Sequence, residues 1–201
     1  MYYVFDGIDG CGKTTVVSEI SRLLRLSNFT PICLHEPTFG EFGRAARELI
    51  TVEEKPSCHQ LHALFTQDRE EHVRLKIKPA LKFVLQNPTF KILQDRGYLS
   101  APAYQACDDE SIWKLLEEQM AISPLPDRFF LIDVDIAIAM ERIKERGDGR
   151  SIFDRAETLE IARERYLLIA ESGKVPIDVI DGSMPVANIV DKIVGAIGLG
   201  V

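Results

Sequence analysis

The N-terminal segment carries the residues whose types and spacing most directly predict chemistry. Gly7, Gly12, Lys13 and Thr14 match the pattern G-x-x-x-x-G-K-[ST] of a phosphate-binding loop, or P-loop. Glycines allow such a loop to curl so that its backbone N–H groups point inward at a phosphate. The lysine would then reach the β- and γ-phosphates, and the threonine hydroxyl would bind Mg²⁺. This pattern predicts that the chain binds a nucleoside triphosphate.

The segments on either side of the loop support this interpretation. Residues 2–6 are predicted to form a short buried strand, and residues 14–26 a helix whose positive N-terminal end faces the phosphates. A chance glycine-rich turn before a helix is the alternative, and the strand in front makes it the weaker one. The expected nucleotide-binding residues are Gly7, Ile8, Asp9, Gly10, Cys11, Gly12, Lys13, Thr14 and Thr15.

Two further pairs of residues could act on a ligand. Asp95 and Arg96 follow an apolar segment, so the carboxylate could hold Mg²⁺ while the guanidinium takes a phosphate. A structural salt bridge is the alternative for this pair. Phe65 and Arg69 lie four residues apart on a predicted helix and therefore share a face. A ring with a guanidinium one turn away suits a nucleobase, whereas core packing is the alternative for Phe65.

A third candidate is the arginine-rich segment from Arg146 to Arg155, which contains the sequence Gly-Asp-Gly at residues 147–149. Glycines among arginines are typical of a mobile flap that closes over phosphates. Such closure excludes water and brings cationic groups to the phosphoryl group that is transferred. A solvated loop between two helices is the alternative interpretation.

The composition of the chain limits the class of protein. Its 201 residues are enough for one domain with a sizeable core. A net charge of −7 argues against a nucleic-acid binder, which would be basic. No apolar run reaches membrane-spanning length, and no signal-peptide pattern is recognised. The four cysteines form no C-x-x-C pair, so we expect reduced thiols and a cytoplasmic protein.

The hydrophobic pattern predicts strands that alternate with helices. Predicted strands cover residues 2–6, 30–34, 90–94, 128–134 and 176–180. Predicted helices cover residues 14–26, 41–50, 57–78, 109–121, 136–146, a stretch ending at 170, and 186–197. The third of these helices is expected to stop around Pro79. The alternation indicates an α/β fold with a five-stranded parallel sheet covered on both faces, and ligands bind beyond the carboxyl ends of such strands.

Several ordered motifs run along nearly the whole chain. They are Phe5-Asp6-Gly7-Ile8-Asp9-Gly10-x-Gly12-Lys13-Thr14-Thr15, Glu36-Pro37, Leu64-Phe65-x-x-Asp68-Arg69-x-x-His72, Ile77-Lys78-Pro79-Ala80-Leu81, Asp95-Arg96-x-x-x-Ser100-x-x-Ala103-Tyr104-Gln105 and Leu131-Ile132-Asp133-Val134. In this order and spacing they resemble the thymidylate kinases, a family of P-loop nucleoside monophosphate kinases. The P-loop is shared by many ATPases, whereas the Asp-Arg-x-x-x-Ser-x-x-Ala-Tyr-Gln motif is quite specific to this family.

The resemblance implies a P-loop kinase fold, formed as a single domain over residues 1–201 with a mobile LID flap at about 147–155. The implied reaction transfers the γ-phosphoryl of ATP to dTMP and gives dTDP and ADP. Mg²⁺ would be held by Thr14 and Asp95. The implied partners are the two nucleotides and a second copy of the chain in a homodimer, with no nucleic acid and no membrane.

The resemblance also implies roles for residues around the acceptor. Phe65 would stack on the thymine, and Arg69 would hydrogen-bond its carbonyl. Tyr104 would lie under the deoxyribose and leave no room for a 2′-hydroxyl. Arg47 and Arg96 would grip the monophosphate. The complete set of implied substrate-binding residues is Asp9, Glu36, Arg47, Phe65, Arg69, Arg96, Ser100 and Tyr104.

Members of the family take a catalytic arginine either from the P-loop or from the flap. Gly10 and Cys11 occupy the variable loop positions here and neither is basic, so the sequence resembles the flap type, with Arg150 or Arg155 as the donor. The implied catalytic residues are Lys13, Arg96, Arg150 and Arg155.

Two alternatives stay open at this point. One is a related kinase for another nucleotide or for a nucleoside, because Gly97 and Ala101 replace larger residues of the family pattern. A nucleoside kinase would not need Arg47 and Arg96 to grip a phosphate. The other is a P-loop switch that binds a nucleotide without phosphorylating an acceptor.

Overall fold

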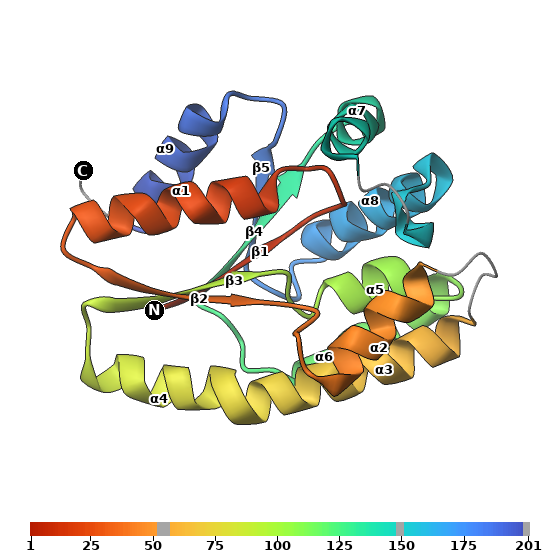
Figure 1. Cartoon of the computed structure of the whole chain (residues 1–201), viewed down its shortest axis with the longest axis horizontal. Helices are drawn as coiled ribbons and strands as arrows, with labels where there is room; N and C mark the ends of the chain where they lie inside the picture. Colours follow the sequence, from red (N-terminus) through yellow and green to blue (C-terminus); the bar gives the residue numbers. More distant parts are fainter. Residues whose placement is uncertain (52–56, 148–150, 199–201) are drawn as a thin grey trace.

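The structure is a computed structural model that describes residues 1–51, 57–147 and 151–198 (Figure 1). Its sheet has five parallel strands in the order β2-β3-β1-β4-β5. The strands are β1 (Tyr2–Asp6), β2 (Thr30–His35), β3 (Phe90–Asp95), β4 (Arg128–Asp133) and β5 (Ile177–Asp181). The predicted α/β fold with a five-stranded parallel sheet is confirmed.

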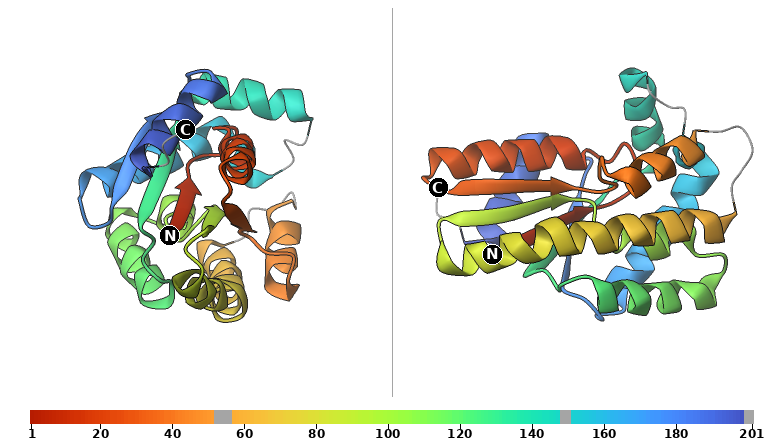
Figure 2. Two further views of the ribbon diagram at one scale, coloured as in Figure 1. Left: turned by 90° about the vertical axis from the view of Figure 1, so that its left-hand side faces the viewer. Right: turned by 60° about the horizontal axis from the view of Figure 1, so that its bottom comes forward.

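Helices cover both faces of this sheet, as Figures 1 and 2 show. The helices are α1 (Lys13–Leu26), α2 (Glu41–Ile50), α3 (Cys58–His72), α4 (Lys78–Gln86), α5 (Ser100–Gln105), α6 (Asp109–Ile122), α7 (Ile136–Arg146), α8 (Ala156–Glu171) and α9 (Val186–Ala196). Helices α1 and α9 lie on one face, and the long α3–α4 rod lies with α6 on the other. Helices α2, α5 and the start of α8 project beyond the carboxyl ends of the strands.

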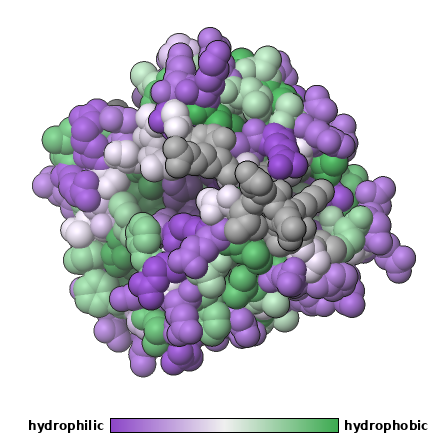
Figure 3. All heavy atoms as spheres, turned by 45° about the vertical axis from the view of Figure 1, so that its right-hand side comes forward, coloured by the Kyte–Doolittle hydropathy of each residue, from purple (hydrophilic) through white to green (hydrophobic). Residues whose placement is uncertain are grey.

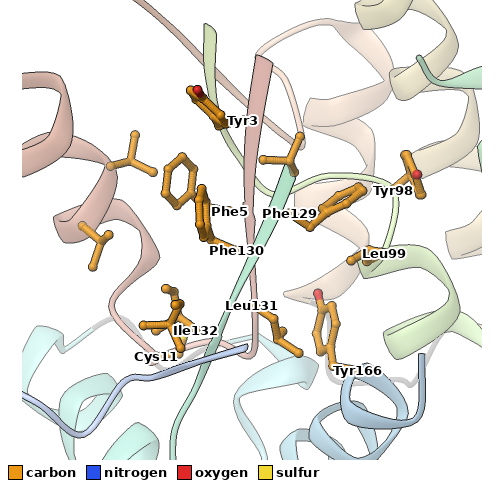
Figure 4. Close-up of a cluster of buried hydrophobic side chains, with 14 of the residues drawn as sticks. Tyr3, Phe5, Cys11, Tyr98, Leu99, Phe129, Phe130, Leu131, Ile132 and Tyr166 are labelled. Atoms are coloured by element: carbon orange, nitrogen blue, oxygen red, sulfur yellow. The ribbon is translucent and has the colours of Figure 1, made fainter. Parts of the chain in front are cut away.

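The core is built from both faces of the central strands (Figure 4). Phe5 of β1 stacks on Phe130 of β4 with ring centroids 5.4 Å apart, on the side of α1. On the opposite side, Phe129 packs edge-to-face against Tyr98 at 4.9 Å. Because both faces of β1 and β4 are covered, these strands are apolar at nearly every position, as buried parallel strands usually are.

One predicted helix boundary is wrong. The helix that was expected to stop around Pro79 continues as α4 to Gln86. A wider π-helical turn at Val73–Ile77 joins α3 to α4, and the proline falls in the first turn of α4. The π-helical turn accommodates the proline, because the regular i→i−4 hydrogen bonding is already interrupted just before the residue that lacks an N–H.

The expectation of four reduced cysteines is also wrong. Cys11 and Cys33 are free thiols, but Cys107 is disulfide-bonded. Disulfide formation depends on two cysteines being brought within a few ångströms by the fold, which sequence spacing does not reveal.

A separate expectation concerns membranes. Within the described residues, no helix is long and apolar enough to cross one.

Gly97 departs from the family pattern for a structural reason. A Cβ atom added there would lie 2.4 Å from Cγ1 of Val4 and 3.2 Å from the ring of Phe129, both in the core. A larger residue therefore has no room at this position of the turn after β3.

This geometry predicts the effect of Gly97→Ala. The variant should lower the free energy of unfolding by about 1–3 kcal/mol, the usual cost of overpacking. Gly195→Ala is the matched control, because an added Cβ meets nothing within 4 Å there and a helical alanine is slightly favoured. Urea unfolding of both variants measures the difference, and equal midpoints would contradict this explanation of Gly97.

Candidate active site

Two adjoining cavities, which share four lining residues, lie beyond the carboxyl ends of the strands, and Figure 3 shows a hollow on this face of the molecule. We call the first, of about 440 Å³, the inner pocket, and the second, of about 1150 Å³, the P-loop cleft. The inner pocket is lined partly by Phe65, Arg69, Tyr104, Gln105 and Phe153. The P-loop cleft is lined partly by Gly12, Lys13, Thr14, Asp95 and Arg142. The residues that line both cavities are Asp9, Glu36, Arg96 and Arg146.

The P-loop adopts a conformation that requires its glycines. Gly10 has a φ of 79°, and a Cβ atom there would lie 2.3 Å from the carbonyl oxygen of Ala139. Lys13 is buried, and its Nζ donates to the carbonyl oxygens of Gly7 at 2.9 Å and Ile8 at 2.8 Å. The ammonium group therefore lies inside the loop, at the floor of the P-loop cleft, where a phosphate would meet a positive charge.

Thr14 and Asp95 meet at the edge of this cleft. The Thr14 hydroxyl donates to Oδ2 of Asp95 at 2.6 Å, although the two residues belong to α1 and β3. This oxygen pair fits Mg²⁺, which usually takes one or two carboxylates and completes its shell with water and substrate phosphates. No group of three or more His, Cys, Asp or Glu residues that could hold a metal is found within the described ranges.

Asp9, Arg96 and Tyr104 form a cluster where the two cavities join. The guanidinium of Arg96 pairs with the carboxylate of Asp9 and lies over the ring of Tyr104, 5.4 Å from its centroid. The Tyr104 hydroxyl also accepts from the backbone N–H of Asp9 at 3.0 Å. Burial opposes ionisation of Asp9, but the charges of Arg96 and Lys13 outweigh it, so the pKa of Asp9 is lowered. The Asp9–Arg96 pair is therefore ionised at neutral pH.

Arg96 adopts a backbone conformation that is costly for an arginine, with a φ of 64°. The buried carboxylate of Asp6 holds the turn in place. It accepts from the N–H of Gly97 at 3.0 Å, from the Ser100 hydroxyl at 2.7 Å and from the Tyr166 hydroxyl at 3.1 Å. Ser100 thus faces Asp6, which places it as a support for Arg96 as well as a residue that lines the inner pocket.

A second buried cluster fixes Arg69 at the back of the inner pocket. Glu36 accepts from Nε and Nη2 of Arg69 at 2.8 and 2.6 Å and pairs with Nδ1 of His72 at 2.9 Å. Arg69 also donates to Gln119 and to the carbonyl oxygen of Gly97. Four of the five guanidinium N–H groups are thereby used, and the fifth, on Nη1, has no protein partner among the described residues. Glu36 accordingly orients Arg69.

Some of the other predicted site residues line the inner pocket, and others do not. Phe65 and Tyr104 face Phe153, with ring centroids at 6.5 and 4.9 Å from it, so the inner pocket has three aromatic walls. Arg47 lines the pocket but donates to the carbonyl oxygens of Pro37 and Thr38. Arg155 is exposed at the start of α8 and lines neither cavity. Arg150, the other predicted flap donor, lies outside the described residues.

Sequence reasoning assigned no individual role to several residues that line the cavities, among them Gln105, Arg142, Arg146 and Phe153, although Arg146 and Phe153 lie in the arginine-rich candidate segment. Arg142 donates to the carbonyl oxygens of Cys11 and Gly182, which ties α7 to the P-loop. Arg142 and Arg146 are four residues apart on α7, so their shared face just before the flap was a usable signal. Ala101, by contrast, is buried and does not line either cavity in the part of the chain described.

The parallel sheet, the P-loop and the adjoining aromatic pocket together define a P-loop nucleotide kinase. A sequence model of the family described as "Thymidylate kinase" matches residues 5–193. Among curated proteins, the "Probable thymidylate kinase" of Archaeoglobus fulgidus is 32% identical over 96% of this chain and 92% of its own length. The "Thymidylate kinase" of Fervidobacterium nodosum is 34% identical over 96% of both chains, and that of Akkermansia muciniphila is 34% identical over 94% of this chain and 88% of its own. The chain belongs to the thymidylate kinase family, and it is an ATP-dependent kinase.

The buried Glu36 cluster predicts a pH-dependent stability. Burial opposes the charge of Glu36, but Arg69 and His72 lower its pKa below the ordinary value of 4.5. Its contribution to folding is therefore complete above pH 4.5 and is lost as the pH falls through the lower pKa of the folded state. Glu36→Gln should lower the free energy of unfolding near pH 7 by about 3 kcal/mol, because it leaves Arg69 buried without its partner.

The measurement is urea unfolding at several pH values between 7 and 3.5. The difference between wild type and Glu36→Gln should shrink below pH 4.5, whereas the exposed Glu117→Gln should differ little from wild type throughout. A difference that stays constant down to pH 3.5 would show that the ion pair is not its source.

Proposed function

We propose that this protein is a thymidylate kinase that transfers the γ-phosphoryl of ATP to the 5′-phosphate of dTMP, giving dTDP and ADP. The observation that carries the proposal is the junction of the two cavities. A phosphate-binding loop opens into one cavity, three aromatic rings line the other, and Asp9, Arg96 and Arg146 lie between them. A phosphate donor and a planar acceptor could therefore meet at a row of charged groups.

In the proposed reaction, an oxygen of the dTMP phosphate bonds to the γ-phosphorus while the bond to the β,γ-bridging oxygen breaks and ADP leaves. Such transfers need alignment and charge neutralisation more than covalent help from the protein. Lys13 and the P-loop N–H groups would hold the donor phosphates, and Arg96 would hold the acceptor phosphate. Mg²⁺, held by Thr14 and Asp95, would neutralise charge on the donor. Closure of a LID at residues 147–155 would exclude water within this single domain.

The proposed acceptor site uses the inner pocket. The thymine would stack on Phe65, where Phe153 from the flap segment is near enough to cover it. Two polar groups could serve the base edge: the amide of Gln105, and the Nη1 N–H of Arg69 that has no partner within the described ranges. Tyr104 would pack against the deoxyribose. Arg47 would have to leave its carbonyl partners to reach the phosphate, so its role is the least supported of this set.

The proposal also covers the oligomeric state and the cellular location of the enzyme. We infer a homodimer, as the family resemblance implies, and a cytoplasmic location. Exposed apolar residues such as Phe83, Leu85 and Leu125 on the α3–α4 and α6 side of the molecule leave surface that a second copy could cover.

We predict that a flap arginine supplies charge to the transition state. Arg155→Ala and Arg150→Ala are each expected to lower kcat, and the more important of the two by roughly 10²–10⁵, as for other donor and arginine-finger deletions. Binding of dTMP alone should change little, because the flap cation acts on the transferring group. The exposed Arg22→Ala on α1 is the control. If both flap variants and their double variant keep near-normal kcat, another cation such as Arg146 has this role.

The experiment that tests the proposed function is ADP formation with ATP, Mg²⁺ and a panel of acceptors: dTMP, dUMP, dCMP, dGMP and AMP. We expect dTMP to be the best acceptor by kcat/KM, with dUMP weaker by roughly 10–200-fold, because one methyl group in an apolar pocket discriminates by that much. Slow ATP hydrolysis that is indifferent to every acceptor would indicate a switch. A preference for dCMP would overturn the thymidylate assignment and leave the kinase assignment standing.

The same assay tests Tyr104. Deoxyribonucleotides should be preferred over ribonucleotides, and Tyr104→Ala should erode this preference more than it lowers kcat, because the ring occupies the space of a 2′-hydroxyl. Tyr104→Phe is the matched control, since it keeps the ring and removes only the hydroxyl bonded to Asp9. An unchanged ribose discrimination in Tyr104→Ala would place the sugar elsewhere.

A further inference from the structure

A short polar chain runs from the surface to the wall of the inner pocket. Glu118 of α6 pairs with Nε2 of His62 at 3.3 Å, and Nδ1 of the same ring lies 3.2 Å from Oε1 of Gln105. Three helices, α3, α5 and α6, which pack against one another (Figure 1), each contribute one residue. Gln105 is 7% exposed and lines the pocket, whereas His62 does not.

The chain determines which end of the Gln105 amide is available to a ligand. A side-chain amide has a carbonyl oxygen that accepts and an NH₂ group that donates, and the two exchange places when the amide flips. Here Oε1 faces Nδ1 of the His62 ring at 3.2 Å, and a carboxylate oxygen of Glu118 faces Nε2 at 3.3 Å, so each ring nitrogen lies opposite an oxygen that accepts hydrogen bonds. Within the described residues the amide nitrogen has no hydrogen-bond partner. The group left for the pocket is therefore a donor.

A second donor belongs to Arg69, which lines the same pocket and whose remaining Nη1 N–H has no partner in the part of the chain that the structure describes. Two donors suit a base edge that carries carbonyl oxygens. Thymine and uracil both present two carbonyls on their hydrogen-bonding edge, whereas cytosine replaces one of them with an amino group, which is itself a donor. A buried donor facing another donor is left unpaired, and that is the strongest form of rejection available to a binding site.

We propose that His62 is a positioning residue for acceptor specificity: held by Glu118, it fixes the Gln105 amide with its NH₂ group toward the base and so selects thymine and uracil over cytosine. The proposal rests on the proposed function, because it places the acceptor base in the inner pocket. In this proposal, discrimination between thymine or uracil and cytosine depends on His62, a residue that does not contact the substrate.

The test compares kcat/KM for dTMP, dUMP and dCMP in the wild type, His62→Leu, His62→Lys, Gln105→Leu and the double variant His62→Leu/Gln105→Leu. In His62→Leu the amide is free to flip, so the ratio of dTMP to dCMP should fall about tenfold, the worth of one hydrogen bond. The change should appear mainly in KM. The ratio of dTMP to dUMP should stay unchanged, because these bases have the same edge.

His62→Lys should restore the wild-type ratio of dTMP to dCMP, since an ammonium can only donate and keeps Oε1 of Gln105 turned toward it. In the Gln105→Leu background, His62→Leu should have no further effect on that ratio, which shows that His62 acts through the amide. A general distortion would instead lower kcat and alter both ratios, and that result would overturn the proposal.

The two hypotheses fail differently. If the wild type phosphorylates no nucleoside monophosphate, the proposed function is wrong and the inference falls with it. If the wild type prefers dTMP but His62→Leu keeps the full preference over dCMP, only the inference is wrong.

Discussion

The buried carboxylate of Asp6 is the constraint on which the site depends. Burial raises its pKa, and the protein offsets this cost with three donors and with nearby Arg96 and Lys13. Those donors come from the turn after β3, from α5 and from α8, so one side chain at the end of the central strand joins three segments. Each segment contributes to the site: the turn carries Arg96, α5 carries Tyr104, and α8 follows the flap.

The strained conformation of Arg96 is explained by this arrangement. An arginine with a positive φ is unfavourable by itself, and it persists only where neighbouring bonds determine it. The N–H of Gly97 bonded to Asp6 fixes the turn immediately after Arg96, and Gly97 is small enough for that turn to pack on Val4 and Phe129. The guanidinium is thereby aimed at Asp9, at the junction of the two cavities, before any phosphate arrives.

The two sides of the site are organised by different means. The P-loop cleft is built around residues 9–15, which are close together in sequence. The inner pocket is made of side chains whose orientation depends on other side chains, such as the buried Glu36 behind Arg69 and the partly exposed His62 behind Gln105. This difference suits the two ligands, because phosphates are recognised by charge and N–H groups in any triphosphate, whereas a base must be distinguished from similar bases.

The sequence alone determined those features that depend on residues close together in the chain. The P-loop, the five strands to within about one residue, and the shared helical face of Phe65 and Arg69 all follow from periodicity and spacing over a few residues. Only the tertiary structure decided the rest, because its causes are distant in sequence: Asp6 bonds to Tyr166, 160 positions away, and Glu36 to Arg69, 33 positions away. The continuation of the helix through Pro79, the disulfide of Cys107 and the lack of room at Gly97 likewise depend on packing between segments, which no local pattern contains.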